Sequence, residues 1–299
     1  MSASIFNLSS LNGSNGFRVD GEHEDDQSGS FVSSAGDVNG DGFGDVIVGA
    51  MGADTNGTYS GLSYVVFGKA SGFDAQLDLS SLDGRNGFRL DGEHENDFSG
   101  FSVSRSGDVN GDGFGDVIVG AWGNDSNGDS HGSSYVVFGK ASRFAAKMDL
   151  SSLDGSNGFR LNGENNYDYS GRSVSGAGDV NGDGFGDVIV GAHGVDSNGA
   201  NSGSSYVVFG KASGFAAQLD LSSLDGSNGF RVDGEHTYDQ SGSFVSSAGD
   251  VNGDGFDDVI VSAAGTDSNG DYSGSSYLVF GRTSGFAAQL DLSSLDGSD

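Results

Sequence analysis

Short hydrophobic runs rich in β-branched and aromatic residues alternate with clusters of Gly, Asn, Asp and Ser along the whole chain. Near the start of the sequence these runs are Phe17–Asp20, Phe31–Ala35, Val46–Ala50 and Ser63–Phe67. Runs of this length and composition, bounded by turn-forming residues, predict β-strands. No segment has the spacing of an amphipathic helix, and we interpret the recurring AAQLDLSSL as a connection, because its Leu-Asp-Leu alternates.

The same set of four runs returns four times along the sequence. The copies begin at Gly36, Gly107, Gly178 and Gly249, which gives a period of 71 residues. Four short strands in each repeated unit are typical of a propeller blade. The sequence therefore predicts an all-β fold, a β-propeller with four blades of four antiparallel strands. The expected single domain, 1–299, consists of the repeats 8–78, 79–149, 150–220 and 221–291 and a partial fifth copy, 292–299.

The order of the runs also predicts how the ring closes. If Phe31–Ala35 is the innermost strand of its blade, the last blade lacks an outer strand, and the N-terminal Phe17–Asp20 is available to supply it beside Ser276–Phe280. Such a splice removes open strand edges, which otherwise promote aggregation. A ring of four strongly twisted sheets leaves a narrow hub, so the alternative is a larger ring completed by a second copy of the chain.

Each repeat contains one motif with the chemistry of a metal site, D-x-N-x-D-G-x-x-D. Oxygen-bearing side chains at positions 1, 3, 5 and 9, a backbone carbonyl at position 7 and Gly at position 6 suit calcium, which takes six to eight oxygen ligands. The alternative is a solvated turn, which Asn, Asp and Gly form without metal. We favour four Ca²⁺ sites, because four copies each crowd three carboxylates together, and these would repel one another without a cation. The predicted ligands are Asp37, Asn39, Asp41, Phe43 and Asp45; Asp108, Asn110, Asp112, Phe114 and Asp116; Asp179, Asn181, Asp183, Phe185 and Asp187; and Asp250, Asn252, Asp254, Phe256 and Asp258.

Charge and composition exclude several other classes of protein. The formal net charge of -30 argues against nucleic acid and anionic membrane surfaces as partners, since these require a basic footprint. No apolar run is long enough to span a bilayer, so we expect no membrane insertion. Cysteine is absent, which rules out a disulfide framework, and MSASIFNLSS lacks the basic and apolar regions of a secretion signal. We expect a monomer.

These motifs resemble the FG-GAP repeat of integrin alpha subunits and of many secreted bacterial proteins. The resemblance rests on the D-x-N-x-D-G-x-x-D loop, the VIVGA strand after it and the SYVVFG strand that closes the unit. It implies calcium binding between the first two strands of each blade, an extracellular location and a role in adhesion or ligand binding. The chain departs from the family pattern at Met51, Trp122, His193 and Ala264, where the family has Pro, and its repeat number is below the usual seven. Near-identical repeats without proline are also consistent with an engineered or recently duplicated chain, and the missing signal with a fragment or a recombinant form.

Two windows differ between the repeats while the metal loops scarcely change. One covers residues 23–27, 94–98, 165–169 and 236–240, and the other begins at Met51, Trp122, His193 and Ala264. Strand direction places both on the face opposite the metal loops, where Trp122, Phe98, Tyr167, Tyr169 and Tyr238 are available to contact an unknown protein or glycan ligand. The alternative is that these loops are simply unconstrained.

Other polar residues have simpler interpretations. We interpret His23, His94 and His236 as surface residues, and the invariant Asp26, Asp97, Asp168 and Asp239 as turn-stabilising acceptors of backbone N–H groups. Arg105 on an innermost strand is a candidate to line the central channel.

No nucleophile elbow, catalytic Cys or phosphate-binding glycine loop is present, so we expect no enzyme. The favoured function is a calcium-binding extracellular module for binding, adhesion or scaffolding. The alternatives are a purely structural propeller and a metal-assisted hydrolase.

Overall fold

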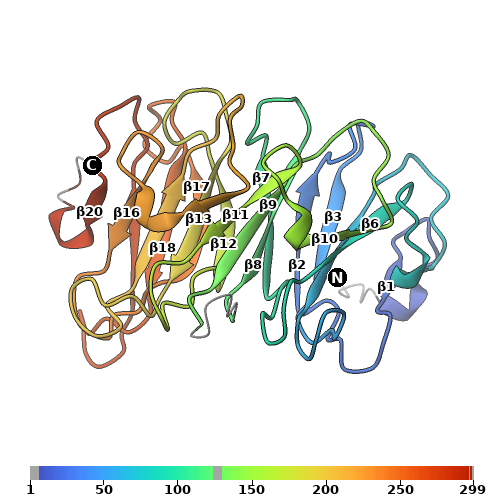
Figure 1. Cartoon of the computed structure of the whole chain (residues 1–299), viewed down its shortest axis with the longest axis horizontal. Coiled ribbons are helices and arrows are strands. Elements are labelled where there is room, and N and C mark those ends of the chain that lie inside the picture. The colour runs from blue at the N-terminus through green and yellow to red at the C-terminus, as the bar shows by residue number, and fades with distance from the viewer. Residues whose placement is uncertain (1–6, 124–129, 296, 298–299) are drawn as a thin grey trace, which may run out of the picture.

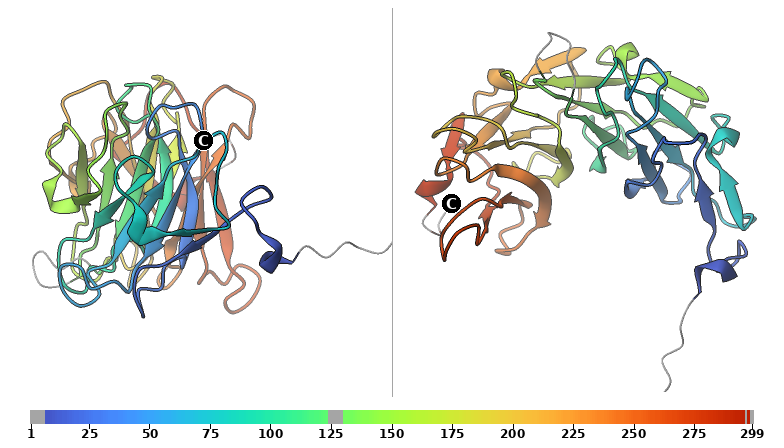
Figure 2. Two further views of the ribbon diagram at one scale, coloured as in Figure 1. Left: turned by 90° about the vertical axis from the view of Figure 1, so that its right-hand side faces the viewer. Right: turned by 90° about the horizontal axis from the view of Figure 1, so that it is seen from below.

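The computed structural model of the 299-residue chain describes residues 7–123, 130–295 and 297. Within these residues the regular elements are β-strands and short 3₁₀ turns, as the sequence predicts, and α-helix is absent. The strands form four similar sheets, here called blades 1 to 4, which stand side by side along an arc (Figures 1 and 2). The arrangement is of the propeller type.

Blades 1 to 3 each contain four antiparallel strands. Blade 1 consists of β2 (Phe31–Gly36), β3 (Asp45–Ala50), β4 (Leu62–Val66) and β6 (Gly87–Asp91). Blade 2 consists of β7 (Ser102–Gly107), β8 (Asp116–Ala121), β9 (Ser133–Val137) and β11 (Gly158–Asn162). Blade 3 consists of β12 (Ser173–Gly178), β13 (Asp187–Ala192), β14 (Ser204–Val208) and β16 (Gly229–Asp233). Blade 4 has three described strands, β17 (Ser241–Gly249), β18 (Asp258–Ala263) and β19 (Ser275–Val279).

The segment that we interpreted as a connection contains a fifth strand. The short strands are β5 (Gln76–Asp78), β10 (Lys147–Asp149), β15 (Gln218–Asp220) and β20 (Gln289–Asp291). The last three pair in parallel with the outer strands β6, β11 and β16 of blades 1 to 3. A 3₁₀ turn follows each of them, and another lies near the N-terminus: η1 (Leu8–Ser10), η2 (Leu79–Ser81), η3 (Leu150–Ser152), η4 (Leu221–Ser223) and η5 (Leu292–Ser294). Asp78 serves both elements, because it pairs along β5 and also caps the turn by accepting a hydrogen bond from Ser80 N.

The innermost strand of each blade is the one that the sequence predicts. β2, β7, β12 and β17 lie next to one another and line a hollow of about 760 Å³ on the inner side of the arc. Arg105, an exposed residue of β7, lines this hollow, which agrees with the position expected for it.

The hydrophobic core lies between neighbouring blades rather than within a blade. One cluster combines Ile47 and Val65 of blade 1 with Val117 and Tyr135 of blade 2, and all four side chains are fully buried. Glycine permits this close approach: a Cβ on Gly49 would lie 2.0 Å from the carbonyl oxygen of Gly100 in the next blade. Each blade therefore buries its face only when another blade stacks on it.

The predicted splice between the two ends of the chain is not formed. β1 (Arg18–Asp20) pairs in parallel with β5, not with the strand at Ser276–Phe280. The first and last blades stand at opposite ends of an open arc (Figure 2), so these two segments lie far apart. The prediction of pairing within one chain was wrong because the number of blades in the chain does not close the arc.

Candidate metal centres

The four predicted metal loops connect the innermost strand of each blade to the second strand. In the first loop Gly40 and Gly42 have φ angles of 71° and 86°, in the left-handed region that favours glycine. The glycine at loop position 6 has the same conformation in the other copies, with φ values of 89° at Gly113, 88° at Gly184 and 93° at Gly255. The sharp turn expected at this position is therefore present in all four loops.

The side chains of three predicted ligands in each loop accept hydrogen bonds from backbone amides of that loop. In the first copy Asp41 N donates to Asp37 Oδ1 at 3.0 Å and to Asn39 Oδ1 at 2.9 Å, and Gly42 N donates to Asp37 Oδ2 at 2.9 Å. Asp41 Oδ1 accepts a hydrogen bond from Phe43 N at 2.9 Å. The other loops repeat these contacts to within about a tenth of an ångström. Side-chain oxygens of positions 1, 3 and 5 are thus fixed by backbone amides of their own loop.

The aspartate at position 9 has a different environment. Asp45 is buried, and its two carboxylate oxygens accept hydrogen bonds from Val38 N and Gly68 N, both at 2.8 Å. These bonds fasten the metal loop to the end of β4. Burial, with a smaller contribution from the nearby charges of Asp41 and Asp37, raises the pKa of Asp45 to about 6. For the same reason, burial first, the pKa is about 7 at Asp116 and about 8 at Asp187.

The donor set fits a hard cation. Each loop offers carboxylate and amide oxygens, and the predicted carbonyl at position 7 belongs to a residue that is exposed in the first copy, Phe43. The oxygens of Asp37, Asp41 and Asp45 do not all lie within 4.8 Å of one another, because Asp45 is turned toward the two amides. Binding by all three carboxylates would therefore require a small movement of side chains. The assignment of these residues as ligands stays a prediction.

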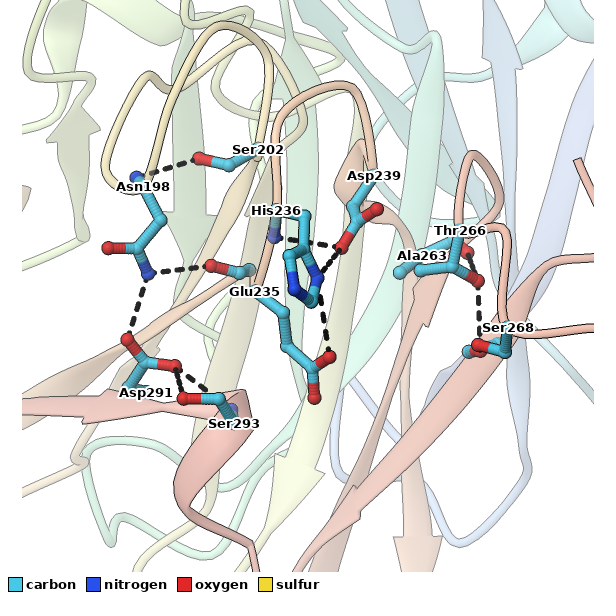
Figure 3. A network of polar contacts seen from close by, with 12 residues as sticks. Asn198, Ser202, Glu235, His236, Asp239, Ala263, Thr266, Ser268, Asp291 and Ser293 are labelled. Carbon is cyan, nitrogen blue, oxygen red and sulfur yellow. Dashed lines mark hydrogen bonds and ion pairs between the residues drawn. The ribbon is translucent and has the colours of Figure 1, made fainter. Parts of the chain in front are cut away.

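A second cluster of metal-binding side-chain types lies at the other end of blade 4. Among the residues that the structure describes, Glu235, His236 and Asp239 form the one group of three His, Asp or Glu side chains whose ligand atoms lie within 4.8 Å of one another. Figure 3 shows His236 between the two carboxylates, with Nδ1 3.6 Å from Glu235 Oε2 and 3.6 Å from Asp239 Oδ2. The counterparts His23 and His94 in blades 1 and 2 also lie 3.5–3.9 Å from their Glu and Asp, but there the Glu binds an arginine as well.

The invariant aspartates of the first variable window stabilise turns, as expected. Asp26 Oδ2 accepts a hydrogen bond from His23 N at 3.2 Å, and Asp97, Asp168 and Asp239 make the same contact at 2.8–2.9 Å. The backbone carbonyl of Asp26 also accepts a bond from Gly52 N at 3.1 Å, which joins the two variable windows. Both windows therefore share the end of the blades opposite the metal loops.

Aromatic side chains from the variable windows form a continuous row across blades 2 and 3. Trp122 stacks on Phe98 with ring centroids 5.0 Å apart and meets Tyr169 edge-on at 5.7 Å. Tyr169 in turn stacks on His193 at 5.4 Å, and Tyr167 beside it is exposed. Burial lowers the pKa of His193 to about 4, with a smaller contribution from the charge of Arg172. This imidazole is therefore neutral at pH 7.

One set of contacts was missed by reasoning from the sequence. Arg89 of β6 pairs with Glu22 at 2.7 Å, and the same pair forms between Arg160 and Glu93 at 2.8 Å. Arg231 and Glu164 repeat it at 3.2 Å. The signal was available, because the Arg of each FR(V/L)(D/N) run and the Glu of each following GE recur with the repeat. Only the stacking of the blades shows that each Arg binds the Glu of the preceding copy.

Comparison with known proteins finds FG-GAP repeats in this chain and similarity to parts of integrin alpha chains. The FG-GAP repeat model matches residues 28–66, 170–208 and 241–279, and each match runs from just before an innermost strand, through a metal loop, to the third strand. Integrin alpha pat-2 of Caenorhabditis elegans is 41% identical over 101 residues, which is 33% of this chain and 8% of that protein. Integrin alpha-PS5 of Drosophila melanogaster is 31% identical over 182 residues, which is 59% of this chain and 16% of that protein. The matched regions thus span less than a fifth of either relative.

Proposed function

We propose that this chain, which carries FG-GAP repeats and is similar to part of integrin alpha chains, is a calcium-binding extracellular module for adhesion or ligand binding. The observation that carries the proposal is the fourfold repetition of one oxygen-rich loop with the same hydrogen bonds. The carboxylates at positions 1 and 5 hydrogen-bond only within their own loop, so packing of the described fold does not explain why they are there.

Electrostatics supports a divalent cation at these loops. Each of the first three loops places two further carboxylates close to a buried aspartate whose pKa burial has already raised. A bound Ca²⁺ would reverse this repulsion and stabilise the folded chain by mass action. Loops of extracellular modules bind calcium with dissociation constants on the order of 10⁻⁴–10⁻³ M, and we expect values in that range.

The variable end of the blades is the proposed contact surface for a ligand. Its aromatic row, from Phe98 through Trp122 to Tyr169, combines large rigid side chains with the different loop sequences of each blade. Aromatic residues of this kind dominate binding energy at many interfaces. The described residues contain no helix long and apolar enough to cross a membrane. A purely structural role is the alternative, and it requires that no ligand binds at this end.

Calcium titration calorimetry tests the metal proposal. We expect four ions per chain for the unmodified protein and three for each of the single variants Asp41→Asn, Asp112→Asn, Asp183→Asn and Asp254→Asn. The matched control is Asp25→Asn, which removes the same charge at an exposed position outside the loops and should keep four ions. Stoichiometry that does not change among these variants would refute the assignment of the loops.

A protein and glycan array, probed with calcium-saturated chain, tests the contact surface. Any ligand found there should lose affinity when Trp122→Ala and Tyr169→Ala are introduced together. Phe43→Ala is the control, because it removes an exposed aromatic ring beside a metal loop at the opposite end. Loss of affinity in the control alone would place the contact surface at the metal loops, and an array without hits would favour the structural role.

A further inference from the structure

The two ends of the arc carry complementary open strand edges. β1 pairs with β5 in the register that β6 uses with β10, so β1 occupies the position of an outer strand. The other edge of β6 pairs with β4, whereas the corresponding edge of β1 has no strand partner among the described residues. At the far end of the arc β19 lacks the outer strand that β4, β9 and β14 each have. One end of the molecule thus offers an outer strand, and the other end lacks one.

The exposed face of blade 1 has the composition of a buried blade interface. Val32 is 66% exposed, although its equivalents in blades 2 to 4, Val103, Val174 and Val245, are only 4–7% exposed. Val46 is likewise open while Val117, Val188 and Val259 are fully buried. Together with Phe17 and Val19, these residues line an apolar depression of about 530 Å³. Both positions are Val in all four blades, so the difference lies in the absence of a blade packed against this face.

The outer face of blade 4 is open in the same way. Val251 is 53% exposed, whereas its equivalents Val38, Val109 and Val180 are at most 1% exposed. Phe244, at 70%, is a second large apolar side chain on this face. Exposed apolar surface of this extent, made of positions that are buried elsewhere in the same chain, marks an interface.

We propose that a second copy of this chain covers both faces, so that two arcs join head to tail in a closed ring of eight blades. The blade number selects this stoichiometry, because rings of identical four-blade chains contain multiples of four blades and propellers have four to eight. A one-chain ring of four is not the arrangement observed, and three chains would exceed the range. Each chain would give its β1 to blade 4 of the other, so the two junctions are identical and the ring closes.

Internal blade contacts predict which residues meet at the junction. The register of β14 with β16, carried forward by one blade, pairs Tyr277 of β19 with Arg18 of the second copy. Val245 N donates to Ser173 Oγ across the interface between blades 3 and 4, and the same step brings Phe244 to Val32 of the second copy. The two most exposed apolar residues of the opposing faces would therefore cover each other.

An ion pair supplies charge complementarity at the same place. Arg89, Arg160 and Arg231, on the outer strands of blades 1 to 3, each bind the glutamate that precedes the innermost strand of the same blade, one repeat earlier in the sequence, at 2.7–3.2 Å. In this series the next glutamate is Glu235 (Figure 3), whose one ion-pair partner among the described residues is His236. The arginine that heads the series is Arg18, which pairs only with Asp20 on its own strand. Glu235 is thus one half of the corresponding ion pair in blade 4, and Arg18 of the second copy, on the outer strand that this blade lacks, is the other half.

Two features make the junction differ from an internal interface. Ser262 replaces Gly49, Gly120 and Gly191, where a Cβ would lie 2.0–2.1 Å from a carbonyl oxygen of the next blade, so the junction must open slightly there. In addition, Leu8–Ser10 is equivalent to Leu292–Ser294, and only one of the two can occupy that position in the ring. Leu292 is already buried while Leu8 is exposed, so we assign the position to Leu292.

Mass measurement and charge exchange test the proposal. Sedimentation equilibrium in calcium buffer at micromolar concentration should give twice the 30.3 kDa of the chain. Arg18→Glu and Glu235→Arg each place like charges at both junctions, so each variant alone should dimerise at least about tenfold more weakly. Mixed in equal amounts, they should recover the dimer, because every junction of the mixed pair then joins opposite charges.

Further variants separate this interface from general effects. Arg85→Glu makes the same charge change at an exposed site away from the junction and should leave the dimer intact. Ser262→Gly should tighten the dimer, because it removes the Cβ that holds the junction open. A single-chain mass at every concentration, a series of larger open assemblies, or no recovery on mixing the two charge variants would each overturn the proposal.

Discussion

Replacing Asp116 by Ala should show that position 9 of the metal loop has a structural role that does not depend on calcium. Asp116 is fully buried, and its carboxylate accepts hydrogen bonds from Val109 N and Gly139 N, both at 2.8 Å. These two bonds connect the loop of blade 2 to the end of β9. Alanine has no acceptor, so both buried N–H groups would be left without a partner.

The loss in the free energy of unfolding for Asp116→Ala follows from the two hydrogen bonds and from the burial of the carboxylate. Each buried N–H group without an acceptor costs about 1–3 kcal/mol, so the pair costs roughly 2–6 kcal/mol. Removing the carboxylate also removes an unfavourable buried charge, since burial raises its pKa to about 7. We therefore expect the lower part of the range, about 2–4 kcal/mol of the free energy of unfolding.

The matched control is Asp112→Ala in the same loop. Asp112 accepts hydrogen bonds from Phe114 N and Asn110 Nδ2, but it is exposed, so water can replace both contacts. We expect a loss below about 1 kcal/mol in chelator, as for most surface substitutions. Both variants should lose one calcium ion from the stoichiometry.

Urea denaturation in chelator at pH 7 measures the difference. The fluorescence of Trp122, the single tryptophan of the chain, reports unfolding from its stacked position on Phe98. A lower midpoint with an unchanged slope would give the loss in stability directly. Equal midpoints for the Asp116 and Asp112 variants in chelator would refute the reasoning, because they would show that the two buried hydrogen bonds contribute nothing.

Two further predictions concern the row of aromatic residues and the interfaces between blades. His193 has a folded-state pKa of about 4, below its ordinary value, so the unfolded chain binds the proton first and stability falls as the pH drops below about 6.5. Thermal or urea unfolding should show that the unmodified protein loses about 2 kcal/mol of its free energy of unfolding between pH 7 and pH 5, and that the His193→Gln variant does not lose this amount. Equal losses in the two proteins would contradict this assignment of the pH dependence to His193. Phe88→Ala should cost about 3–5 kcal/mol, because this ring is fully buried. Phe17→Ala is the equivalent change at the open end of the arc, and urea titration of the monomer should show a clearly smaller loss in the free energy of unfolding. Equal losses for the two variants would mean that Phe17 is as buried as Phe88 in the monomer.

Much of this protein follows from the sequence alone. Runs of β-branched and aromatic residues between turn-forming residues predicted the four strands of the first repeat to within one residue, because strand preference and turn formation are local properties, although the short strand at Gln76–Asp78 was missed. The turn of each proposed metal loop was equally predictable, since Asp37 and Gly42 lie in one short segment and need no distant partner, whereas the calcium ligands stay a prediction. The turn-stabilising role of Asp26 followed from the same short range.

The sequence could not show which faces of the blades are covered by a neighbouring blade and which are left exposed. Val32 and Val103 stand in nearly the same local sequence, yet one is exposed and the other buried, because only one has a blade stacked on it. The partner of β1 likewise depends on the rotation between successive blades, which is set by packing across every interface and not by any single run of residues. Local pattern therefore determined the blade, while only the tertiary structure showed that the four blades form an open arc.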